Sequence, residues 1–368
     1  LVADGGGRLS AVDEVETIGV KAGPEAAAPG EAADASPPDD RTVPARRAML
    51  PTLSRLAFDL SLLPIVALVL AGQFGGKDWL LDMTNFFRPH IAAVALVLLL
   101  FALLASSMPR LVVAALVVGA AVYPLLVASV PAAANASAGN LRVTTANLNG
   151  RNRDEEGFRR MVEAEAPDIL VVEESNWRWR PVVESLPGLP HVAGADRSSV
   201  MVASRYPVTA EWLDLGPAAN PTDDVGGSGA LRAVVERPDA RPLVVYGVHA
   251  PTTRKVSGWV MRNAYLRAVA ERVKAEPAGT DLLVVGDWNT PYWSPVLRSF
   301  MNRSGLVTTE RGAWPPPTRF FREFRAPPAL GTPIDRIAVP GRIGVAAINV
   351  SKDFGSDHLA VTADLAIP

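Results

Sequence analysis

Polar residues that can bind metals or transfer protons recur where short apolar runs end in the C-terminal part of the chain. They are Asn147, Glu173 with Glu174, His249, Asp287 with Asn289, Asp335, and Asp357 with His358. Loops at the ends of strands expose such side chains on a rigid scaffold. This placement is typical of a catalytic site built on strand ends.

The chemistry that these residue types suit best is hydrolysis of a phosphoester. That reaction requires neutralisation of a phosphoryl group, activation of water and help for the leaving oxygen. Carboxylate and amide oxygens bind a hard ion such as Mg²⁺, imidazoles donate to phosphate oxygens, and a further carboxylate can act as base. A zinc site fits less well, because the chain has four histidines and no cysteine. Of these, His90 lies beside an apolar run and His191 in a proline-flanked loop.

The elements that must position these residues are short strands separated by turns and a few helices. The predicted strands cover 141–145, 169–172, 199–203, 231–235, 243–248, 282–285, 334–339 and 359–363. One helix is clear over 257–276, where apolar residues form a single stripe. Many strands with few helices predict an α/β sandwich of two packed sheets with helices outside.

The N-terminal part of the chain has a different composition. Residues 1–45 are rich in Ala, Gly, Pro, Asp and Glu, which predicts a disordered tail. In the membrane region, 46–131, three apolar runs at about 56–74, 91–108 and 111–130 are each near the roughly 20 residues of a transmembrane helix. The first run contains Asp59 and Pro64, so a buried amphipathic or re-entrant helix is its alternative.

Positive charges indicate how these helices would be oriented. Before the first run stand Arg41, Arg46, Arg47 and Arg55, and Arg110 lies between the second and third. Because positive residues stay on the cytoplasmic side, three crossings predict a multi-pass protein of a bacterial inner (plasma) membrane with an extracytoplasmic catalytic domain. The loop that contains Asp82 would also be outside, and the orientation inverts if the first run does not cross.

Seven motifs in the C-terminal part resemble the endonuclease/exonuclease/phosphatase family, which has the deoxyribonuclease I-like fold. They are TTANLNGRN, PDILVVEES, VASRYP, VYGVHAPT, VVGDWNT, PIDRIAV and GSDHLAV, in this order. Each motif alone is weakly specific, but together they are highly specific. The resemblance covers about 141–366 and implies a four-layer α/β/β/α sandwich for the domain 141–368, preceded by three transmembrane helices.

The resemblance also implies a metal site. Glu174 matches the family's metal-binding glutamate, and Glu173 occupies the position where relatives usually have glutamine. Asn147 resembles the asparagine that contacts the metal or the phosphate, and Asp357 resembles a second metal carboxylate. Mg²⁺ is the implied ion, with Mn²⁺ as a substitute.

The remaining matched residues imply catalytic roles. Asp287 would orient or deprotonate the attacking water, and Asn289 would hold phosphate. His358 would stabilise the phosphoryl transition state, with Asp335 hydrogen-bonded behind it. His249 would be a second phosphate-binding imidazole.

Two features favour a lipid over a nucleic acid as substrate. Ala146 stands where relatives that cleave nucleic acid commonly have an aromatic residue, and this variant is similar to membrane-bound bacterial members that include glycopeptide-resistance-associated phosphatases. The domain carries about 27 basic and about 26 acidic residues and therefore lacks a strong positive field. We expect a membrane-anchored phosphoesterase that contacts the bilayer and acts on a phosphorylated substrate, possibly a polyprenyl pyrophosphate. A DNA or RNA nuclease and a binding module with a degenerate site are the alternatives.

Each site residue has a structural alternative. Gly-Asp and Ser-Asp pairs often form turns, His249 could simply end a strand, and Asn147 and Asn152 could be Asx-turn residues. Asp335 could pair with Arg336 at the surface, and Arg232 could face phosphate or solvent.

Two aromatic clusters have two interpretations each. They are Trp288 with Tyr292 and Trp293, and the segment 314–324. Either cluster could pack beneath loops, or it could form a rim that enters the membrane interface with Arg319, Arg322 and Arg325.

Overall fold

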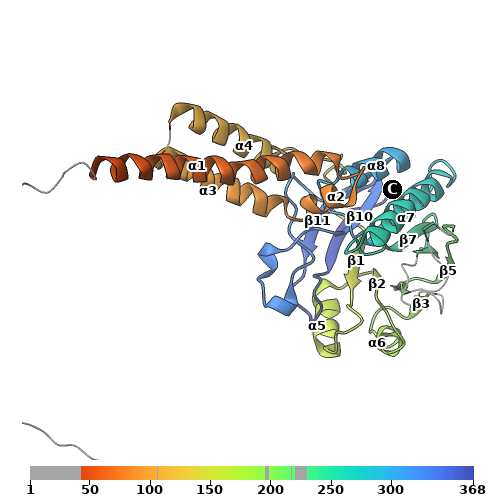
Figure 1. The fold of residues 1–368 in the computed structure, drawn as a ribbon. Coiled ribbons are helices and arrows are strands. Elements are labelled where there is room, and N and C mark those ends of the chain that lie inside the picture. Colours follow the sequence, from red (N-terminus) through yellow and green to blue (C-terminus); the bar gives the residue numbers. More distant parts are fainter. Residues whose placement is uncertain (1–42, 106, 195–198, 217, 220–229) are drawn as a thin grey trace, which may run out of the picture. The chain divides into compact units, whose positions relative to one another are not determined.

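The computed structural model describes residues 43–368 except 106, 195–198, 217 and 220–229 (Figure 1). The chain divides into two units, residues 1–51 and residues 52–368. Of the first unit, only the start of helix α1 (Val43–Ala71) is described. The predicted disordered tail, 1–45, therefore lies almost wholly outside the described residues.

Two six-stranded sheets form the C-terminal part of the second unit. The first has the order β11-β12-β1-β2-β4-β3, and the second has the order β5-β6-β7-β8-β10-β9. The strands are β1 (Leu141–Asn147), β2 (Ile169–Glu173), β3 (His191–Ala193), β4 (Met201–Ser204), β5 (Val208–Trp212), β6 (Ala230–Val235), β7 (Leu243–His249), β8 (Asp281–Asp287), β9 (Leu306–Thr308), β10 (Asp335–Pro340), β11 (Gly344–Val350) and β12 (Val361–Ala366). All eight predicted strands are confirmed, and β3, β5, β9 and β11 were not predicted.

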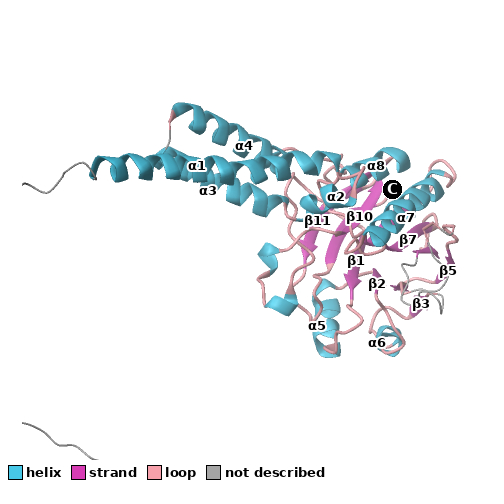
Figure 2. Cartoon of the chain, viewed as in Figure 1, coloured by secondary structure: helices cyan, strands magenta, loops and turns pink. Residues whose placement is uncertain are grey.

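The sheets pack face to face and are covered by helices on their outer faces (Figure 2). The central core consists of inward-facing residues of both sheets, such as Val143, Val171, Val245 and Val285. Helices α5 (Glu155–Glu165) and α6 (Trp179–Glu184) cover the first sheet. Helices α7 (Val256–Lys274) and α8 (Pro295–Ser304) cover the second. The central strands β2, β7 and β8 are buried along almost their whole length. Successive side chains on them point alternately to the core between the sheets and to the covering helices, which gives the four-layer α/β/β/α sandwich.

The three apolar runs are helical. They form α1, α3 (Arg88–Ala105) and α4 (Met108–Leu126). By length and composition, residues 52–74 and α4 are each able to cross a membrane. The third candidate is α3 taken together with the short helix α2 (Trp79–Phe86), to which it is bent by 74°. Two helices, or up to three, therefore have the character of membrane spans.

Asp59, which weakened the first run as a candidate span, has a partner. Arg110 at the start of α4 donates to both of its carboxylate oxygens, at 2.7 and 2.6 Å. The pairing lowers the cost of placing a carboxylate in an apolar helix. It also joins helices α1 and α4 through two residues that are 51 positions apart in the sequence.

Candidate active site

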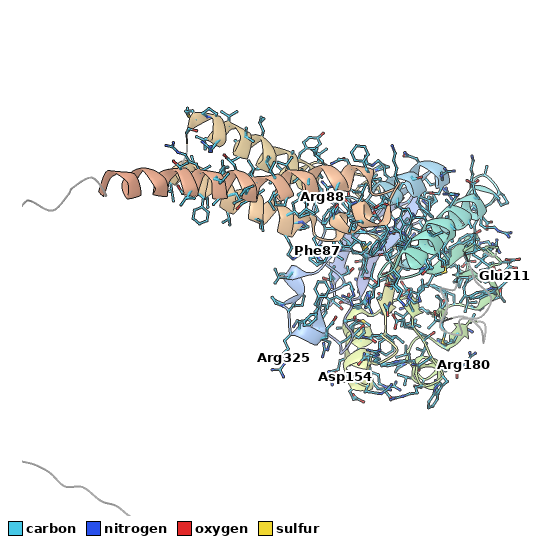
Figure 3. All side chains as sticks on the ribbon, in the orientation of Figure 1. Phe87, Arg88, Asp154, Arg180, Glu211 and Arg325 are labelled. Carbon is cyan, nitrogen blue, oxygen red and sulfur yellow. The ribbon has the colours of Figure 1, made fainter. Side chains whose placement is uncertain are left out.

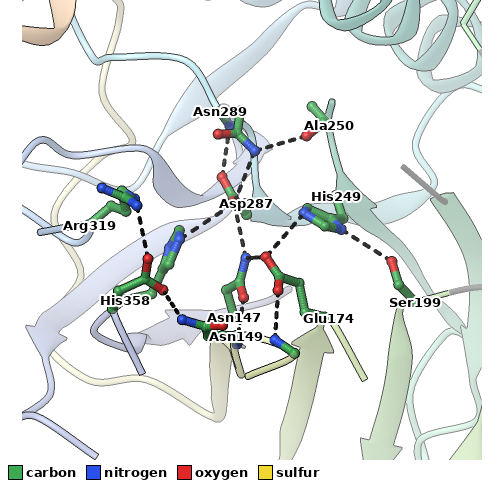
Figure 4. Close-up of polar contacts among 12 residues, drawn as sticks. Asn147, Asn149, Glu174, Ser199, His249, Ala250, Asp287, Asn289, Arg319 and His358 are labelled. Carbon is green, nitrogen blue, oxygen red and sulfur yellow. Dashed lines mark hydrogen bonds and ion pairs between the residues drawn. The ribbon is translucent and has the colours of Figure 1, made fainter. Parts of the chain in front are cut away.

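Strand pairing brings the predicted site residues to one edge of the two sheets. In the first sheet, Asn147 of β1 lies opposite Glu173 of β2. In the second sheet, Asp287 of β8 lies between His249 of β7 and Asp335 of β10. Figure 4 shows side chains from both sheets pointing toward one another.

Asp335 and His358 form a buried pair. Nδ1 of His358 lies 3.0 Å from each carboxylate oxygen of Asp335, so it carries the proton and donates it. Nε2 of the same ring faces Oδ2 of Asp287 at 3.9 Å. The alternative pairing of Asp335 with Arg336 is wrong, because the Arg336 guanidinium bonds Glu310 at 3.2 Å.

Asp287 accepts hydrogen bonds from two asparagine side chains. Its Oδ2 lies 3.1 Å from Nδ2 of Asn147 and 3.1 Å from Nδ2 of Asn289, and its Oδ1 accepts the backbone N–H of Asn289 at 2.8 Å. Asn289 has a φ of 44°, a left-handed conformation that its short side chain tolerates. The turn at residues 286–289 thus fixes the side chains of Asp287 and Asn289 toward each other. An ordinary turn, which the sequence also allows, would not require these side-chain contacts.

Glu174 and His249 form the next part of the site. Oε2 of Glu174 accepts the backbone N–H of Gly150 at 2.7 Å, and Oε1 accepts Nδ2 of Asn147 at 3.3 Å. Nε2 of His249 lies 3.9 Å from Oε1 of Glu174, while its Nδ1 lies 3.1 Å from the Ser199 hydroxyl. His249 therefore faces the site rather than simply ending its strand.

Asp357 lies at the border of the site, and two residues that the sequence did not indicate as its partners hold it. Asn149 donates to its Oδ1 at 2.8 Å, and Arg319 donates to its Oδ2 at 2.9 Å. Asn149 also donates its backbone N–H to Oδ1 of Asn147 at 2.9 Å. The three predicted metal residues Asn147, Glu174 and Asp357 are thus connected through Asn147 and Asn149.

The surroundings of the two imidazoles in the site shift their pKa values in opposite directions. Burial by itself would lower the pKa of His358, but the carboxylates of Asp335, Asp287 and Asp357 raise it to about 10. Burial lowers the pKa of His249, although Glu174 opposes this effect. At neutral pH, His358 is therefore an imidazolium and His249 is neutral.

The carboxylates also differ. Burial, followed by the negative charge of Asp335, raises the pKa of Asp287 to about 7. Burial acts in the same direction on Glu174, but His249 and the Gly150 N–H outweigh it, so that the pKa of Glu174 is lowered. Glu174 is thus the stronger anion, and Asp287 is poised to exchange a proton near neutral pH.

Glu173 is fully buried, and burial raises its pKa well above the usual range. Its Oε1 accepts the Thr145 hydroxyl at 2.8 Å. Its Oε2 has no hydrogen-bond partner among the described residues. A neutral carboxyl group is similar in shape to the carboxamide that relatives usually carry at this position, which explains how a glutamate is tolerated here.

The donors of this site fit a divalent metal ion. One oxygen of Glu174 and one of Asp287 converge on Nδ2 of Asn147, at 3.3 and 3.1 Å, so two carboxylates of the kind that bind hard cations face a common point. A second set, Asp287, Asp335 and His358, has potential ligand atoms within 4.8 Å of one another. We favour the site beside Glu174 and Asn147, because the Asp335 oxygens already accept a hydrogen bond from Nδ1 of His358.

Other residues singled out in the sequence lie outside the site. Arg232 pairs with Glu276 at 2.6 Å, so it does not face phosphate. Asn152 accepts the backbone N–H of Asp154 at 2.9 Å, which confirms an Asx turn. The cluster Trp288, Tyr292 and Trp293 is buried and belongs to the core.

The two packed sheets, with polar side chains gathered at one edge, are the architecture of the endonuclease/exonuclease/phosphatase family. The family model of the endonuclease/exonuclease/phosphatase family matches residues 144–358. The chain belongs to this family, whose members are hydrolases that act on phosphoester bonds and depend on a divalent metal. No curated protein matches the chain.

Solved structures are similar in fold. An endonuclease/exonuclease/phosphatase from Bacteroides vulgatus is 16% identical, with a TM-score of 0.50 over 62% of this chain and 99% of that one. An endonuclease/exonuclease/phosphatase from Beutenbergia cavernae is 20% identical, with a TM-score of 0.47 over 62% and 71% of the two chains. Sphingomyelinase C from Streptomyces griseocarneus is 16% identical, with a TM-score of 0.44 over 62% and 99%.

The geometry allows different residues of the site to take different roles around a bound phosphoester. A divalent ion held by Glu174 and Asn147 would neutralise phosphate charge. The Asp287 carboxylate is placed to take a proton from the attacking water, and the His358 imidazolium is placed to donate to a phosphate oxygen. Asp335 keeps His358 charged and oriented, and neutral His249 can donate through Nε2.

These pKa values predict a bell-shaped dependence of kcat/KM on pH. Activity should rise as Asp287 loses its proton near pH 7 and fall as His358 loses its proton near pH 10. The two limbs belong to the coupled group rather than to single residues. A bound cation favours the carboxylate and should move the acidic limb to lower pH.

The measurement is the rate on a soluble phosphodiester between pH 5 and pH 10.5 at two metal concentrations. His358→Gln should lower the rate and remove the alkaline limb. An alkaline limb that persists unchanged in this variant would contradict the assignment to His358.

Proposed function

We propose that the protein is a membrane-anchored phosphoesterase that uses Mg²⁺, or Mn²⁺ in its place, to hydrolyse the phosphoester or pyrophosphate of a lipid at the bilayer surface. A polyprenyl pyrophosphate is the candidate substrate. The observation that carries the proposal is a contact between the start of an apolar helix and a loop that reaches the site. Asn147, Glu174 and Asp357 would serve the metal, and His249, Asp287, Asn289, Asp335 and His358 would serve phosphate binding and proton transfer.

The aromatic loop, residues 314–330, follows β9 and contains the short helices η2 (Arg322–Phe324) and η3 (Pro328–Leu330). Phe321 of this loop stacks on Phe87, which directly precedes α3, with ring centroids 6.4 Å apart and an interplanar angle of 2°. Figure 3 shows Phe87 and Arg325 among the side chains. Trp314, Phe324 and Leu330 are exposed. Exposed aromatic and basic side chains beside an apolar helix are typical of a surface that enters the lipid headgroup region.

Arg319 connects this loop to the site. Its guanidinium lies 5.3 Å from the centroid of the Phe321 ring and donates to Asp357 at 2.9 Å. Two backbone hydrogen bonds join the same segment to the turn at 357–359. The Phe320 N–H donates to the Asp357 carbonyl at 2.9 Å, and the Leu359 N–H donates to the Thr318 carbonyl. A lipid phosphate that meets the aromatic loop would therefore lie close to the predicted catalytic groups.

The apolar helices support the anchor. Leu104, Leu116 and Leu126 are 86%, 68% and 73% exposed. The protein does not bury leucine side chains that are this exposed on an apolar helix. A lipid bilayer would remove them from water.

The test uses the full chain reconstituted in lipid nanodiscs. With Mg²⁺ or EDTA, the assays measure phosphate release from a polyprenyl pyrophosphate in the same bilayer, p-nitrophenol release from soluble bis-p-nitrophenyl phosphate, and strand cleavage of plasmid DNA. Metal-dependent release from the lipid is expected. Cleavage of plasmid without release from the lipid would replace the proposal with a nuclease function, and no metal-dependent turnover on any substrate would contradict it.

The role of the aromatic loop has its own test. Phe324→Asp should raise KM for the lipid substrate about tenfold, because it places a charge at the interface, and should leave turnover of the soluble ester unchanged. Trp177→Asp is the matched control, since Trp177 is 83% exposed and Phe324 is 78% exposed. Equal effects of the two changes would contradict a membrane role for the loop.

A further inference from the structure

Helix α2 lies between two apolar helices in the sequence, yet it packs on the catalytic sandwich. The Trp79 indole N–H donates to the Thr253 carbonyl at 2.8 Å, and the Trp293 indole N–H donates to the Asn85 carbonyl. Figure 1 draws α2 beside α8. A segment of the predicted membrane region, 46–131, therefore packs on the predicted catalytic domain.

Asp82 is the centre of this contact. It is fully buried, and it forms an ion pair with Arg262 of α7, which is also fully buried. Its other carboxylate oxygen accepts the Ser294 hydroxyl at 3.1 Å. Asp82 was predicted to lie in a loop outside the cytoplasm. In the structure it lies in helix α2, inside the protein, with the partners that a buried charge requires.

Arg262 extends the contact to the active site. Its Nη1 donates to the backbone carbonyl of Asn289 at 2.9 Å and to the Thr290 hydroxyl at 2.8 Å. Asn289 has positive φ and is hydrogen-bonded to Asp287 through both its backbone N–H and its side chain. The Arg262 guanidinium therefore holds the carbonyl of the residue whose conformation fixes the Asp287 carboxylate.

We propose that Asp82 is a positioning residue of the active site, which acts through Arg262 to hold Asn289 and Asp287. The catalytic part of this inference rests on the proposed hydrolase function. In physical terms, the carboxylate of Asp82 compensates the charge of the guanidinium and orients it, and the guanidinium prevents the left-handed residue Asn289 from relaxing. The helix that leads into the apolar helix α3 thereby becomes part of the catalytic machinery.

The experiment compares three variants of the full chain in nanodiscs. Asp82→Asn leaves Arg262 without a counter-ion, and the double variant Asp82→Leu with Arg262→Met replaces the buried pair by apolar side chains of similar size. Glu271→Leu with Arg303→Met is the matched control, because it removes an exposed pair between α7 and α8. For each variant, Tm, kcat, KM and the affinity for Mn²⁺ without substrate are measured.

Asp82→Asn should lower Tm and reduce kcat by about 10- to about 100-fold with little change in KM, because the Asn289 turn shifts. The double variant should regain the wild-type Tm but not kcat, and its Mn²⁺ affinity should stay about tenfold lower. The control pair should change none of these quantities by more than about twofold.

Recovery of Tm, kcat and Mn²⁺ affinity together in the double variant would overturn the proposal, since Arg262 would then serve stability alone. If the wild type turned over none of the substrates, the proposed function would fail, and the Mn²⁺ affinities would still decide whether Asp82 positions the site.

Discussion

Replacement of Asp287 by asparagine is expected to lower the metal-dependent kcat by about 10³-fold or more while leaving Tm unchanged or slightly raised. The loss follows from removing the group placed to accept a proton from water, a contribution of typically about 10²- to 10⁴-fold. Stability should not suffer, because burial and then the negative charge of Asp335 raise the pKa of Asp287 to about 7. Removing one negative charge from such a cluster relieves repulsion.

The control for this prediction is Asp364→Asn. The change is chemically identical, but Asp364 lies on β12 in a half-exposed ion pair with Arg142, for which an effect on kcat of less than about twofold is expected. Both variants are measured by phosphate release and by thermal unfolding in detergent. Retention of kcat by Asp287→Asn would refute the assignment of Asp287 as base.

Gly286→Ala should be the most damaging single change that adds only one methyl group. Gly286 has a φ of 146°, and a Cβ at this position would lie 1.9 Å from the carbonyl oxygen of Val248 on β7. The backbone strain and the overpacking are each worth about 1 to 3 kcal/mol. Because Val248 and Gly286 directly precede His249 and Asp287, we expect loss of activity together with a lower Tm.

Gly279→Ala separates the two causes. Gly279 also has a positive φ, 85°, but no atom lies within 4 Å of a Cβ built there. It should therefore show only a small decrease in Tm and normal turnover. Similar Tm and kcat in the two alanine variants would contradict the close approach of β7 and β8 as the reason for glycine at position 286.

Much of the site could be predicted from the sequence, because its residues lie at the ends of buried strands. The pairing of β7 with β8 and of β8 with β10 places His249, Asp287 and Asp335 side by side, and the apolar patterns of these strands are visible in the sequence. Their catalytic roles remain predictions, since proximity alone does not prove them. Asn149 and Arg319 were missed as partners of Asp357 because they lie in loops, where no periodicity indicates which side chains will meet.

The sequence by itself determined that an apolar helical region precedes a domain rich in strands, and it determined the family of that domain. Both depend on local composition and on residues next to strand ends. Only the tertiary structure decided that Asp82 is buried, since its partner Arg262 is 180 residues away. Nothing in the sequence between the first two apolar runs identifies Asp82, rather than Asp78, as buried. The Asp82 charge is accommodated inside because α7 supplies a guanidinium and Ser294 a hydroxyl at the same point. The contact between Phe87 and Phe321 also appears only in the tertiary structure. The packing of segments distant in the sequence determines which aromatic side chains stay exposed beside the apolar helices.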